Sequence, residues 1–417
     1  MPTLLAPPLA LYVHFPWCVR KCPYCDFNSY TLNGELAQQP YLERLARDIE
    51  AQAPEVTGRE IVSVFLGGGT PSLFSPEAIG QVLEGARRHL RFATDVEVTL
   101  EANPGTIERG RFAAYRAAGV NRVSLGAQSF DAATLKILGR IHSPDETRRA
   151  AEELHAAGLA NFNLDLMYGL PGQDVAGAQA DVHDALALSP AHLSHYQLTL
   201  EPGTVFAARP PPLPDEDTIA AMLIACGERL QAAGFSQYEV SAYARAGRQC
   251  RHNLNYWNFG DYLGVGAGAH GKLTFAARGQ IVRTVQPREP RRYLAAADAA
   301  RTRHVLESEA LPFEFMLNAL RLPGGFSYES FTARTGLADD AIRSRIDALT
   351  ARGLLEPTPG GCRPSPLGLR FLNDLLLEFM PENSRMSGSS TLSMTTLEPQ
   401  VRVPAPLYTG SQAPNAE

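Results

Sequence analysis

The sequence predicts an α/β protein in which six parallel strands form a partial (β/α)6 barrel, followed by a small, mostly helical domain. Over residues 11–200, short apolar runs alternate six times with longer amphipathic segments. Strands that alternate with helices pair in parallel, and right-handed connections curl such a sheet into a barrel or part of one. Beyond about residue 309 the pattern changes to three helical segments, a hairpin and a last helix.

The six strands are expected where runs of valine, isoleucine, leucine and aromatic residues are bounded by turn residues. They are residues 11–15, 61–66, 96–100, 122–125, 162–167 and 192–200. Helices are expected where apolar residues recur at helical spacing, over residues 41–53, 75–90, 109–118, 145–157 and 173–188. Ser75 before Pro76 predicts a helix start, and Gly119 predicts a helix stop.

The second half of the chain has a looser pattern. It contains a predicted helix at 215–233, a strand at 235–240, helices at 310–321, 328–335 and 339–351, a hairpin at 353–364 and a helix at 366–380. The last five elements resemble a winged helix, which can bind DNA in other proteins. A lid or partner-binding domain is the favoured interpretation, because the region shows no dense basic patch. We therefore divide the chain into residues 1–300, 301–380 and a disordered tail, 381–417, rich in Ser, Thr and Pro.

Composition limits the class of protein. With 417 residues the chain exceeds the size of a single core, and 45% hydrophobic with 20% charged residues is typical of a soluble globular protein. The formal net charge of −6 gives no basic field that would recruit nucleic acid or anionic membrane. Six unevenly spaced cysteines fit a reducing cytosol better than a disulfide framework. Because no signal peptide or apolar run of ~18 residues is apparent, we expect a cytoplasmic protein without a transmembrane segment.

Three cysteines lie within eight residues directly after the first strand, at Cys18, Cys22 and Cys25. Pro16 and Pro23 prevent a regular helix there, so the thiolates project from a loop. Thiolates suit iron–sulfur clusters, and three of them would leave one iron of a [4Fe–4S] cube open to a reactant. The alternative is a structural zinc site with His14 or a distant cysteine as fourth ligand. The paired cysteines and histidines typical of zinc fingers are absent from the sequence.

Polar and glycine-rich residues follow the other predicted strands. Gly67 to Thr70 follow the second strand, Glu101 the third and Gln128 the fourth, and Asp165 lies in the fifth. In barrels of this TIM-like kind the site lies at the carboxyl ends of the strands. The sequence therefore predicts that these residues and the cysteine loop share one mouth.

At this point a family resemblance is apparent. Cys-x-x-x-Cys-x-x-Cys after a first strand resembles the signature of the radical S-adenosylmethionine (SAM) enzymes. Tyr-x-His-x-Pro-x-Cys before it, Gly-Gly-Gly-Thr-Pro after the second strand and Met-Tyr-Gly-Leu-Pro-Gly-Gln at the end of the fifth strand resemble the HemN/HemW family of coproporphyrinogen III oxidase-like proteins. The resemblance covers roughly residues 10–380.

The resemblance implies roles for the residues. The three cysteines would bind three irons of a [4Fe–4S] cluster, and SAM would bind the fourth and be cleaved to methionine and a 5′-deoxyadenosyl radical. The implied SAM contacts are Tyr12, Tyr24, Gly68, Gly69, Thr70, Glu101, Gln128, Arg140 and Asp165. Glu101 and Arg140 would contact the charged methionine part and Asp165 the ribose hydroxyls, while the glycines let backbone groups approach.

Two features point to the HemW branch of the family, regarded as heme chaperones. The oxidases carry a further cysteine where this chain has Phe27, and they have a longer N-terminal segment. His252-Asn253-x-x-Tyr256-Trp257 resembles a motif associated with that branch, and its histidine could ligate or flank heme. The alternative is a histidine fixed by hydrogen bonds in a packed turn. His14 and His270 are weaker candidates, and Cys226 is expected in the core.

Three functions remain as hypotheses. The leading one is a heme chaperone that binds heme, a [4Fe–4S] cluster and SAM and passes heme to acceptors such as membrane respiratory proteins, which would bring it to the membrane surface. The second is an oxygen-independent coproporphyrinogen III oxidase. The third is a DNA-associated regulator that uses the C-terminal domain. No catalytic residue is assigned, no nucleic-acid partner is expected, and either a monomer or a dimer is compatible with the sequence.

Overall fold

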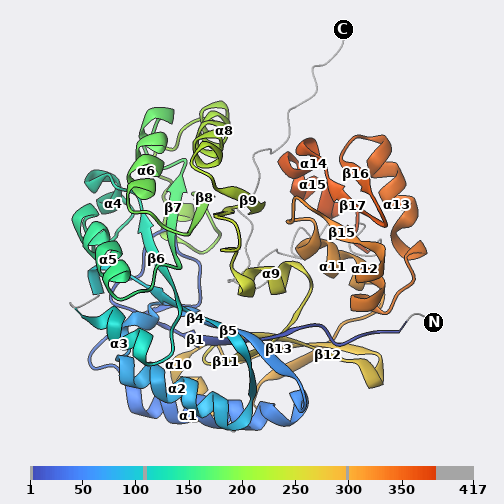
Figure 1. Ribbon diagram of the computed structural model, residues 1–417, viewed down its shortest axis with the longest axis horizontal. Coiled ribbons are helices and arrows are strands. Elements are labelled where there is room, and N and C mark those ends of the chain that lie inside the picture. Colours follow the sequence, from blue (N-terminus) through green and yellow to red (C-terminus); the bar gives the residue numbers. More distant parts are fainter. Residues whose placement is uncertain (1–2, 107–109, 297–299, 382–417) are drawn as a thin grey trace.

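One curved sheet of twelve strands organises the molecule, which is described by a computed structural model for residues 3–106, 110–296 and 300–381 (Figure 1). Its strands are β1 (Leu9–Phe15), β4 (Glu60–Gly68), β5 (Arg91–Ala102), β6 (Arg122–Gln128), β7 (Phe162–Tyr168), β8 (His192–Gln197), β9 (Ser236–Glu239), β10 (Ala242–Ala244), β11 (Asp261–Val265), β12 (His270–Phe275), β13 (Gln280–Val285) and β14 (Thr302–Val305). They lie in the order β14-β13-β12-β11-β1-β4-β5-β6-β7-β8-β10-β9.

The centre of the sheet is parallel and its edges are antiparallel. The six predicted strands are β1, β4, β5, β6, β7 and β8, and they pair in parallel in this order, which confirms the partial barrel. β11 pairs in parallel with β1 as a seventh strand. β12 to β14 and β9 to β10 extend the two edges with antiparallel pairs. The strands β11 to β14 were not predicted; Gly264 in β11 and Gly271 in β12 interrupt the apolar pattern of the first two.

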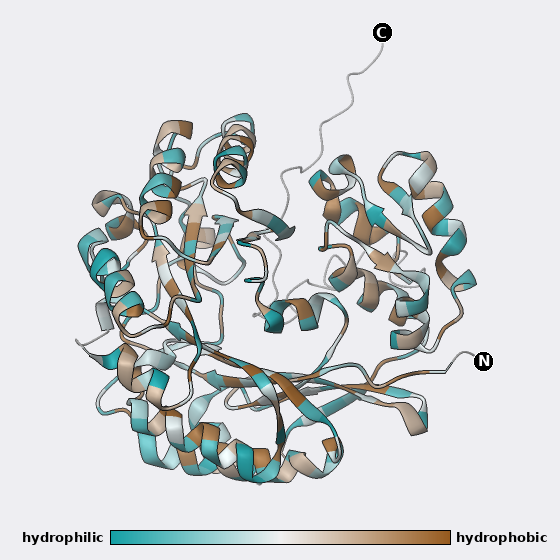
Figure 2. Cartoon of the chain, viewed as in Figure 1, coloured by the Kyte–Doolittle hydropathy of each residue, from teal (hydrophilic) through white to brown (hydrophobic). Residues whose placement is uncertain are grey.

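Helices cover one side of the sheet and leave the other side to the site. The covering helices are α1 (Gln38–Gln52), α2 (Pro76–His89), α3 (Arg111–Ala117), α4 (Ala132–Ile137), α5 (Pro144–Ala156), α6 (Val175–Ala187) and α8 (Glu216–Ala232). In Figure 2 the strands are largely brown between these helices, whose outer surfaces are more teal. α9 (Arg251–Trp257) lies across the sheet from α1 and α2 (Figure 1).

Local signals explain most helix ends. The Ser75 side chain accepts a hydrogen bond from the Ala78 nitrogen at 3.2 Å, with Pro76 at the first helical position of α2, as predicted. Gly119 follows α3 with φ +108°, a conformation that glycine adopts easily. The short helix α4 was not predicted, and Arg109, the predicted start of α3, lies outside the described residues.

The C-terminal part has its own core and a small sheet. Its elements are α11 (Leu311–Ala319), β15 (Phe326–Ser327), α12 (Tyr328–Thr335), α13 (Asp340–Ala351), β16 (Leu355–Thr358), β17 (Gly361–Pro364), α14 (Pro366–Arg370) and α15 (Leu372–Leu377). The predicted hairpin is β16 and β17, and β15 adds a third strand. The single last helix was a wrong prediction: the backbone leaves the helical region at Phe371, which turns α15 so that Leu372, Leu375 and Leu376 are buried. The boundary at residue 300 stays a prediction, and all but the first residue of the predicted tail lie outside the described residues.

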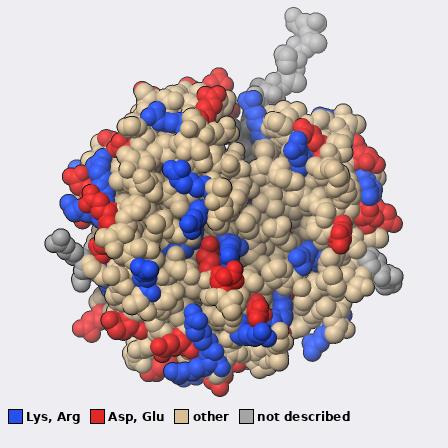
Figure 3. Space-filling model, in the orientation of Figure 1, with Lys and Arg blue, Asp and Glu red and all other residues tan. Residues whose placement is uncertain are grey.

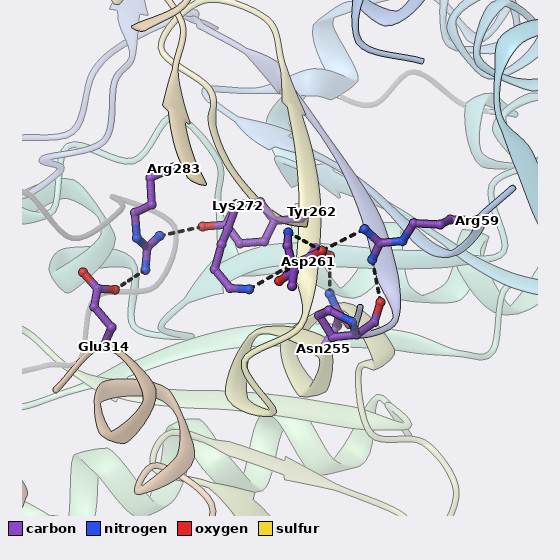
Figure 4. Close-up of polar contacts among 9 residues, drawn as sticks. Arg59, Asn255, Asp261, Tyr262, Lys272, Arg283 and Glu314 are labelled. Atoms are coloured by element: carbon purple, nitrogen blue, oxygen red, sulfur yellow. Dashed lines mark hydrogen bonds and ion pairs between the residues drawn. The ribbon is translucent and has the colours of Figure 1, made fainter. Parts of the chain in front are cut away.

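A buried polar network joins the missed strands to the rest of the sheet (Figure 4). Asp261 at the start of β11 accepts hydrogen bonds at 2.8 Å from Lys272 on β12 and from Arg59 before β4. Burial alone would raise the pKa of the Asp261 carboxyl, but these two cations hold the pKa below its ordinary value. Nearby, Arg283 of β13 pairs with Glu314 of α11 at 2.6 Å, which ties the sheet to the C-terminal part.

The surface shows no single-sign field on the face seen in Figure 3, where basic and acidic side chains are interspersed. No helix among the described residues is long and apolar enough to cross a membrane.

Candidate functional site

The cysteine loop is held by backbone pairing and by one lysine. Cys18 ends the short strand β2 (Trp17–Cys18), which pairs in parallel with β3 (Tyr30–Thr31). The Cys25 nitrogen donates to the Cys22 oxygen at 3.1 Å, which makes a tight turn between the second and third cysteines. Lys21 Nζ donates to two carbonyl oxygens farther along, those of Phe27 and Ser29, at 2.9 and 3.1 Å. All three cysteines are free and partly accessible.

These cysteines and the strand ends line one cavity of about 360 Å³. It is also lined by most of the predicted SAM residues: Tyr24, Gly68, Gly69, Thr70, Glu101, Gln128, Arg140 and Asp165. The shared mouth inferred from the strand order is therefore present. Tyr12 and His252 lie elsewhere.

The donor set fits a cluster better than a single ion. One zinc ion needs four ligand atoms at about 2.0–2.3 Å from a common centre. Among the described residues, no group of three or more His, Cys, Asp or Glu could hold one metal ion in this way. A four-iron cube instead gives each thiolate its own iron, so Cys18, Cys22 and Cys25 need not converge on one centre. Burial raises the pKa of the Cys18 thiol, and it raises that of Cys25 to about 11, so both thiols would keep their protons until metal binding displaces them into solvent.

Two glycines at the end of β4 allow the cysteine strand to pack closely. A Cβ atom on Gly68, which has φ +115°, would lie 2.5 Å from the His14 ring. A Cβ atom on Gly69 would lie 2.6 Å from the Trp17 carbonyl oxygen. Packing against His14 and Trp17 is thus sufficient reason for glycine at positions 68 and 69. Their predicted role in SAM approach stays a prediction.

Two half-buried carboxyl groups, those of Glu101 and Asp165, line the cavity. Glu101 accepts a hydrogen bond from the Gly68 nitrogen at 3.0 Å, yet burial and the nearby Asp165 charge raise the pKa of Glu101 to about 8. Asp165 accepts from Ser124 Oγ at 3.1 Å and from Asn163 Nδ2 at 2.8 Å, and burial raises its pKa. A cationic ligand would favour ionisation of both groups.

Two polar side chains have buried atoms without protein partners. Gln128 has φ +64° where the β6–β7 register shifts, and its Oε1 atom is buried without a hydrogen-bond partner. Arg140 donates from Nη2 to the Gly126 oxygen at 3.0 Å and from Nη1 to Cys22 Sγ at 3.6 Å, but its Nε is also unpartnered. Because buried polar groups are normally hydrogen-bonded, these atoms fit a cavity built for a polar cofactor.

Tyr12 and His252 line a second, smaller cavity of about 70 Å³. The two cavities share the lining residues Phe27, Phe65, Gly68, Glu101 and Asn253. Tyr12 reaches this space from β1 and its hydroxyl lies 2.9 Å from His14 Nδ1. The heme-like motif and the cysteine loop therefore face adjoining spaces.

Both ring nitrogens of His252 have partners. Nδ1 lies 3.0 Å from Ser63 Oγ and Nε2 lies 3.1 Å from the Tyr256 hydroxyl. Burial and the charge of Arg122 lower the pKa of His252 to about 3, so the ring is neutral. In this conformation it is a packed, hydrogen-bonded histidine, and its heme role stays a prediction.

His14, Cys226 and Cys250 are buried, and His270 is half-buried. His14 Nε2 lies 2.8 Å from the Asn28 oxygen, and burial lowers the pKa of His270 to about 4. Cys250 donates from Sγ to Glu97 at 3.5 Å, and Cys226 lies in the main core as expected.

Several cavity residues were not predicted, although they lie an even number of positions before predicted ones. Asn163 lies two positions before Asp165, and Ser124 and Arg122 lie four and six positions before Gln128 on β6. Alternate residues of a strand face the same side, so the period of two could have identified them.

The fold and the cysteine cavity define a radical SAM protein, and comparisons with known proteins agree. Residues 12–185 match the Radical SAM superfamily, and residues 306–371 match the HemN C-terminal domain. The chain also resembles the solved structure of coproporphyrinogen III oxidase (HemN) from Escherichia coli, with a TM-score of 0.76 and 22% identity over 90% of each chain. At that identity the likeness concerns the fold.

Closer relatives narrow the family. The chain is 49% identical to the heme chaperone HemW of Escherichia coli strain K12, over 90% of this chain and 99% of that protein. It is 44% identical to the heme chaperone HemW of Haemophilus influenzae, over 92% of this chain and 100% of that protein. It is 38% identical to mitochondrial radical S-adenosyl methionine domain-containing protein 1 of Mus musculus, over 89% of this chain and 87% of that protein. The chain belongs to the HemW family, which confirms the predicted resemblance, and radical SAM membership implies a [4Fe–4S] cluster and SAM.

Proposed function

We propose that this protein is a heme chaperone that binds heme beside its cluster and SAM site and passes it to acceptor proteins. The observation that carries the proposal is the placement of α9, the helix of the His252 motif. Asn253 of this helix lines the same cavity as the three cysteines. The motif and the cluster loop, more than 200 residues apart in sequence, thus meet at one cavity through Asn253.

Phe27 supports this proposal over oxidase activity. The side chain stands where the oxidases carry a further cysteine, and it is 40% exposed. It lines both cavities, so the substitution concerns the site itself. An aromatic ring at this place offers a packing surface for a macrocycle rather than a sulfur ligand.

The chain's own residues would divide the cofactor binding among them. Cys18, Cys22 and Cys25 would hold three irons, and Glu101 and Arg140 would contact the methionine part of SAM. A bound cluster with SAM supplies one-electron chemistry. Burial of Glu101 and Asp165 keeps the space around them at low dielectric, which strengthens their contacts with a cationic cofactor.

The acceptor and the location belong to the same proposal. Membrane respiratory heme proteins are the proposed acceptors, reached by a cytoplasmic protein that contacts the membrane only peripherally. Both the monomer and the dimer remain compatible with this proposal.

The decisive experiment uses anaerobically reconstituted full-length protein. Heme is titrated with and without SAM and reductant, and coproporphyrinogen III is offered to the same preparation. The proposal expects stoichiometric heme binding and no catalytic conversion of coproporphyrinogen III to protoporphyrinogen. Catalytic turnover would overturn it in favour of the oxidase, and absence of heme binding would overturn it outright. Phe27→Tyr keeps an aromatic ring at the mouth and serves as a matched control for Phe27→Cys.

A further inference from the structure

Arg122, in the first position of β6, is a buried cation that lacks a protein partner. Arg122 as a whole is 2% exposed, and the Nε atom of its guanidinium is buried without a hydrogen-bond partner. The other two large, fully buried arginines are engaged: Arg321 pairs with Glu239 at 2.9 Å, and Arg44 donates to the Tyr293 oxygen at 3.2 Å. Within the described part of the chain, Arg122 has no side-chain hydrogen bond or ion pair. Because an unpaired buried guanidinium is strongly unfavourable, this position points to a ligand.

The carboxylates near Arg122 are already engaged elsewhere. Glu97 accepts hydrogen bonds from the backbone nitrogens of Arg251 and His252 at 2.9 and 3.3 Å, where it holds the start of α9. Asp165 accepts from Ser124 at 3.1 Å. Both carboxylates affect Arg122 electrostatically, but neither forms an ion pair with it. The guanidinium therefore remains available to the cavity that it lines.

Arg122 lies far from the cysteines along this cavity. Gln128, at the mouth, follows six residues later on β6, roughly 20 Å of extended strand. Asn253 of α9 lines the same cavity, and its side chain makes no hydrogen bond to another described residue. Most of the lining is polar or charged, and four apolar side chains lie among it, namely Phe27, Phe65, Met167 and Leu198. The space thus combines a few apolar side chains with a buried cation and an amide.

We propose that Arg122 and Asn253 form a carboxylate subsite that binds a propionate group of heme. The inference rests on the proposed heme binding and adds the place where the porphyrin edge is recognised. A guanidinium presents two parallel N–H donors that match a carboxylate, and the Asn253 amide supplies a further donor. The four apolar side chains offer a packing surface to the macrocycle, which carries its carboxylates on one edge only. His252 and Tyr256, hydrogen-bonded to each other, then position α9 and leave Asn253 to face the ligand.

The test removes the carboxylate from the ligand and the cation from the protein. Affinities for hemin and for hemin dimethyl ester are measured in the same detergent for the full-length protein and for Arg122→Gln. The unaltered protein should bind hemin at least about tenfold more tightly than the ester, as expected for a charged hydrogen bond. Arg122→Gln should bind both ligands as weakly as the unaltered protein binds the ester. Arg20→Gln, which removes an exposed arginine at the same cavity, is the matched control and should keep the preference.

The arms of the experiment separate the alternatives. Asn253→Asp places a negative charge beside the carboxylate and should weaken hemin binding without changing ester binding. Equal affinity of the unaltered protein for hemin and for the ester would overturn the subsite while leaving heme binding intact. This comparison uses the unaltered protein alone, so it does not depend on the folding of any variant. Loss of SAM affinity in Arg122→Gln, with the hemin preference retained, would assign the arginine to the SAM carboxylate instead. Failure of the unaltered protein to bind hemin would overturn the proposed function as well.

Discussion

The backbone nitrogen of Gly68 donates a hydrogen bond to Glu101 Oε2 across 3.0 Å, joining the carboxyl ends of β4 and β5 at the cavity. Gly68 has φ +115°, and the His14 ring leaves no space for a side chain there. Glycine is therefore required at position 68 for two reasons, the positive φ and the close packing of the His14 ring. The contact also places the Glu101 carboxyl toward the cavity.

Replacing Gly68 with alanine should destabilise the fold. The positive φ and the contact at 2.5 Å together predict a loss of about 2 kcal/mol or more in the free energy of unfolding, measured by urea denaturation. Gly85→Ala is the control, because Gly85 lies inside α2 with nothing near its Cβ position. There alanine should raise stability by up to about 1 kcal/mol. Equal stability of the two variants would contradict this account.

Removing one cysteine of the loop should remove the cluster. Cys18→Ala is expected to abolish the broad absorbance near ~400 nm that iron–sulfur clusters give, with a matching loss of iron. Cys362→Ala is the control, since Cys362 is buried in the C-terminal core and should leave the spectrum unchanged. Full iron content in Cys18→Ala would refute the ligand assignment.

Glu101 should make stability depend on pH. Its pKa of about 8 in the folded protein lies above the ordinary 4.5, so its contribution to stability is full below pH 4.5 and is lost as pH rises through 8. The free energy of unfolding should therefore fall relative to Glu101→Gln across this range, by up to about 1.4 kcal/mol per pH unit. SAM should reduce this slope, because its positive charge favours the carboxylate. Parallel pH curves for the two proteins would exclude the raised pKa.

The Asp261 network should be a major contributor to stability. In Asp261→Asn the Lys272 ammonium, only 3% exposed, would lose its charged partner, and breaking such a buried pair costs about 3 kcal/mol or more. Chemical denaturation measures the change. Asp339→Asn breaks an exposed pair with Arg343 and should leave the denaturation midpoint unchanged. A small effect at Asp261 would mean that Arg59 and Lys272 find other partners.

His252→Ala is expected to weaken heme binding and to lower stability. Loss of the ring removes the hydrogen bonds that His252 makes with Ser63 and Tyr256, which costs about 1–3 kcal/mol. His252→Gln can restore one of these hydrogen bonds and is the matched variant. If His252 only positions α9, His252→Gln should recover heme affinity with an unaltered heme absorption spectrum. A changed spectrum in both variants would instead identify the histidine as a heme ligand.

Local patterns in the sequence predicted the parallel half of the fold well. Ser75 with Pro76, and Gly119, are signals that act within a few residues, so the ends of α2 and α3 could be inferred from neighbours alone. The strands β4 to β8 could be predicted for the same reason. The radical SAM residues could be placed at one mouth because parallel strands end on one side.

Relationships between distant residues could not be inferred in this way. The pairing of His252 with Ser63 joins residues 189 positions apart, and it decides whether the ring nitrogens are free. The strands β11 and β12 are largely buried, and hydrogen bonds from Lys272 and Arg59 to Asp261 hold them; these polar side chains hide the strand pattern in the sequence. In the sequence alone, nothing distinguishes Arg122 from an ordinary strand residue.

The pairing of β1 with β11 has a consequence for biosynthesis. β1 leads directly into the cysteine loop, but its second neighbour begins only at Asp261. At ~5–20 residues per second, a ribosome needs roughly 10–50 s to make the intervening chain. During that time β1 lacks one of its two partners, so the strand that carries the cluster loop cannot settle until most of the polypeptide has emerged. Completion of the sheet beneath the cysteine loop therefore waits for the synthesis of β11, and a truncated chain that ends before β11 would present its cysteines on an incomplete sheet.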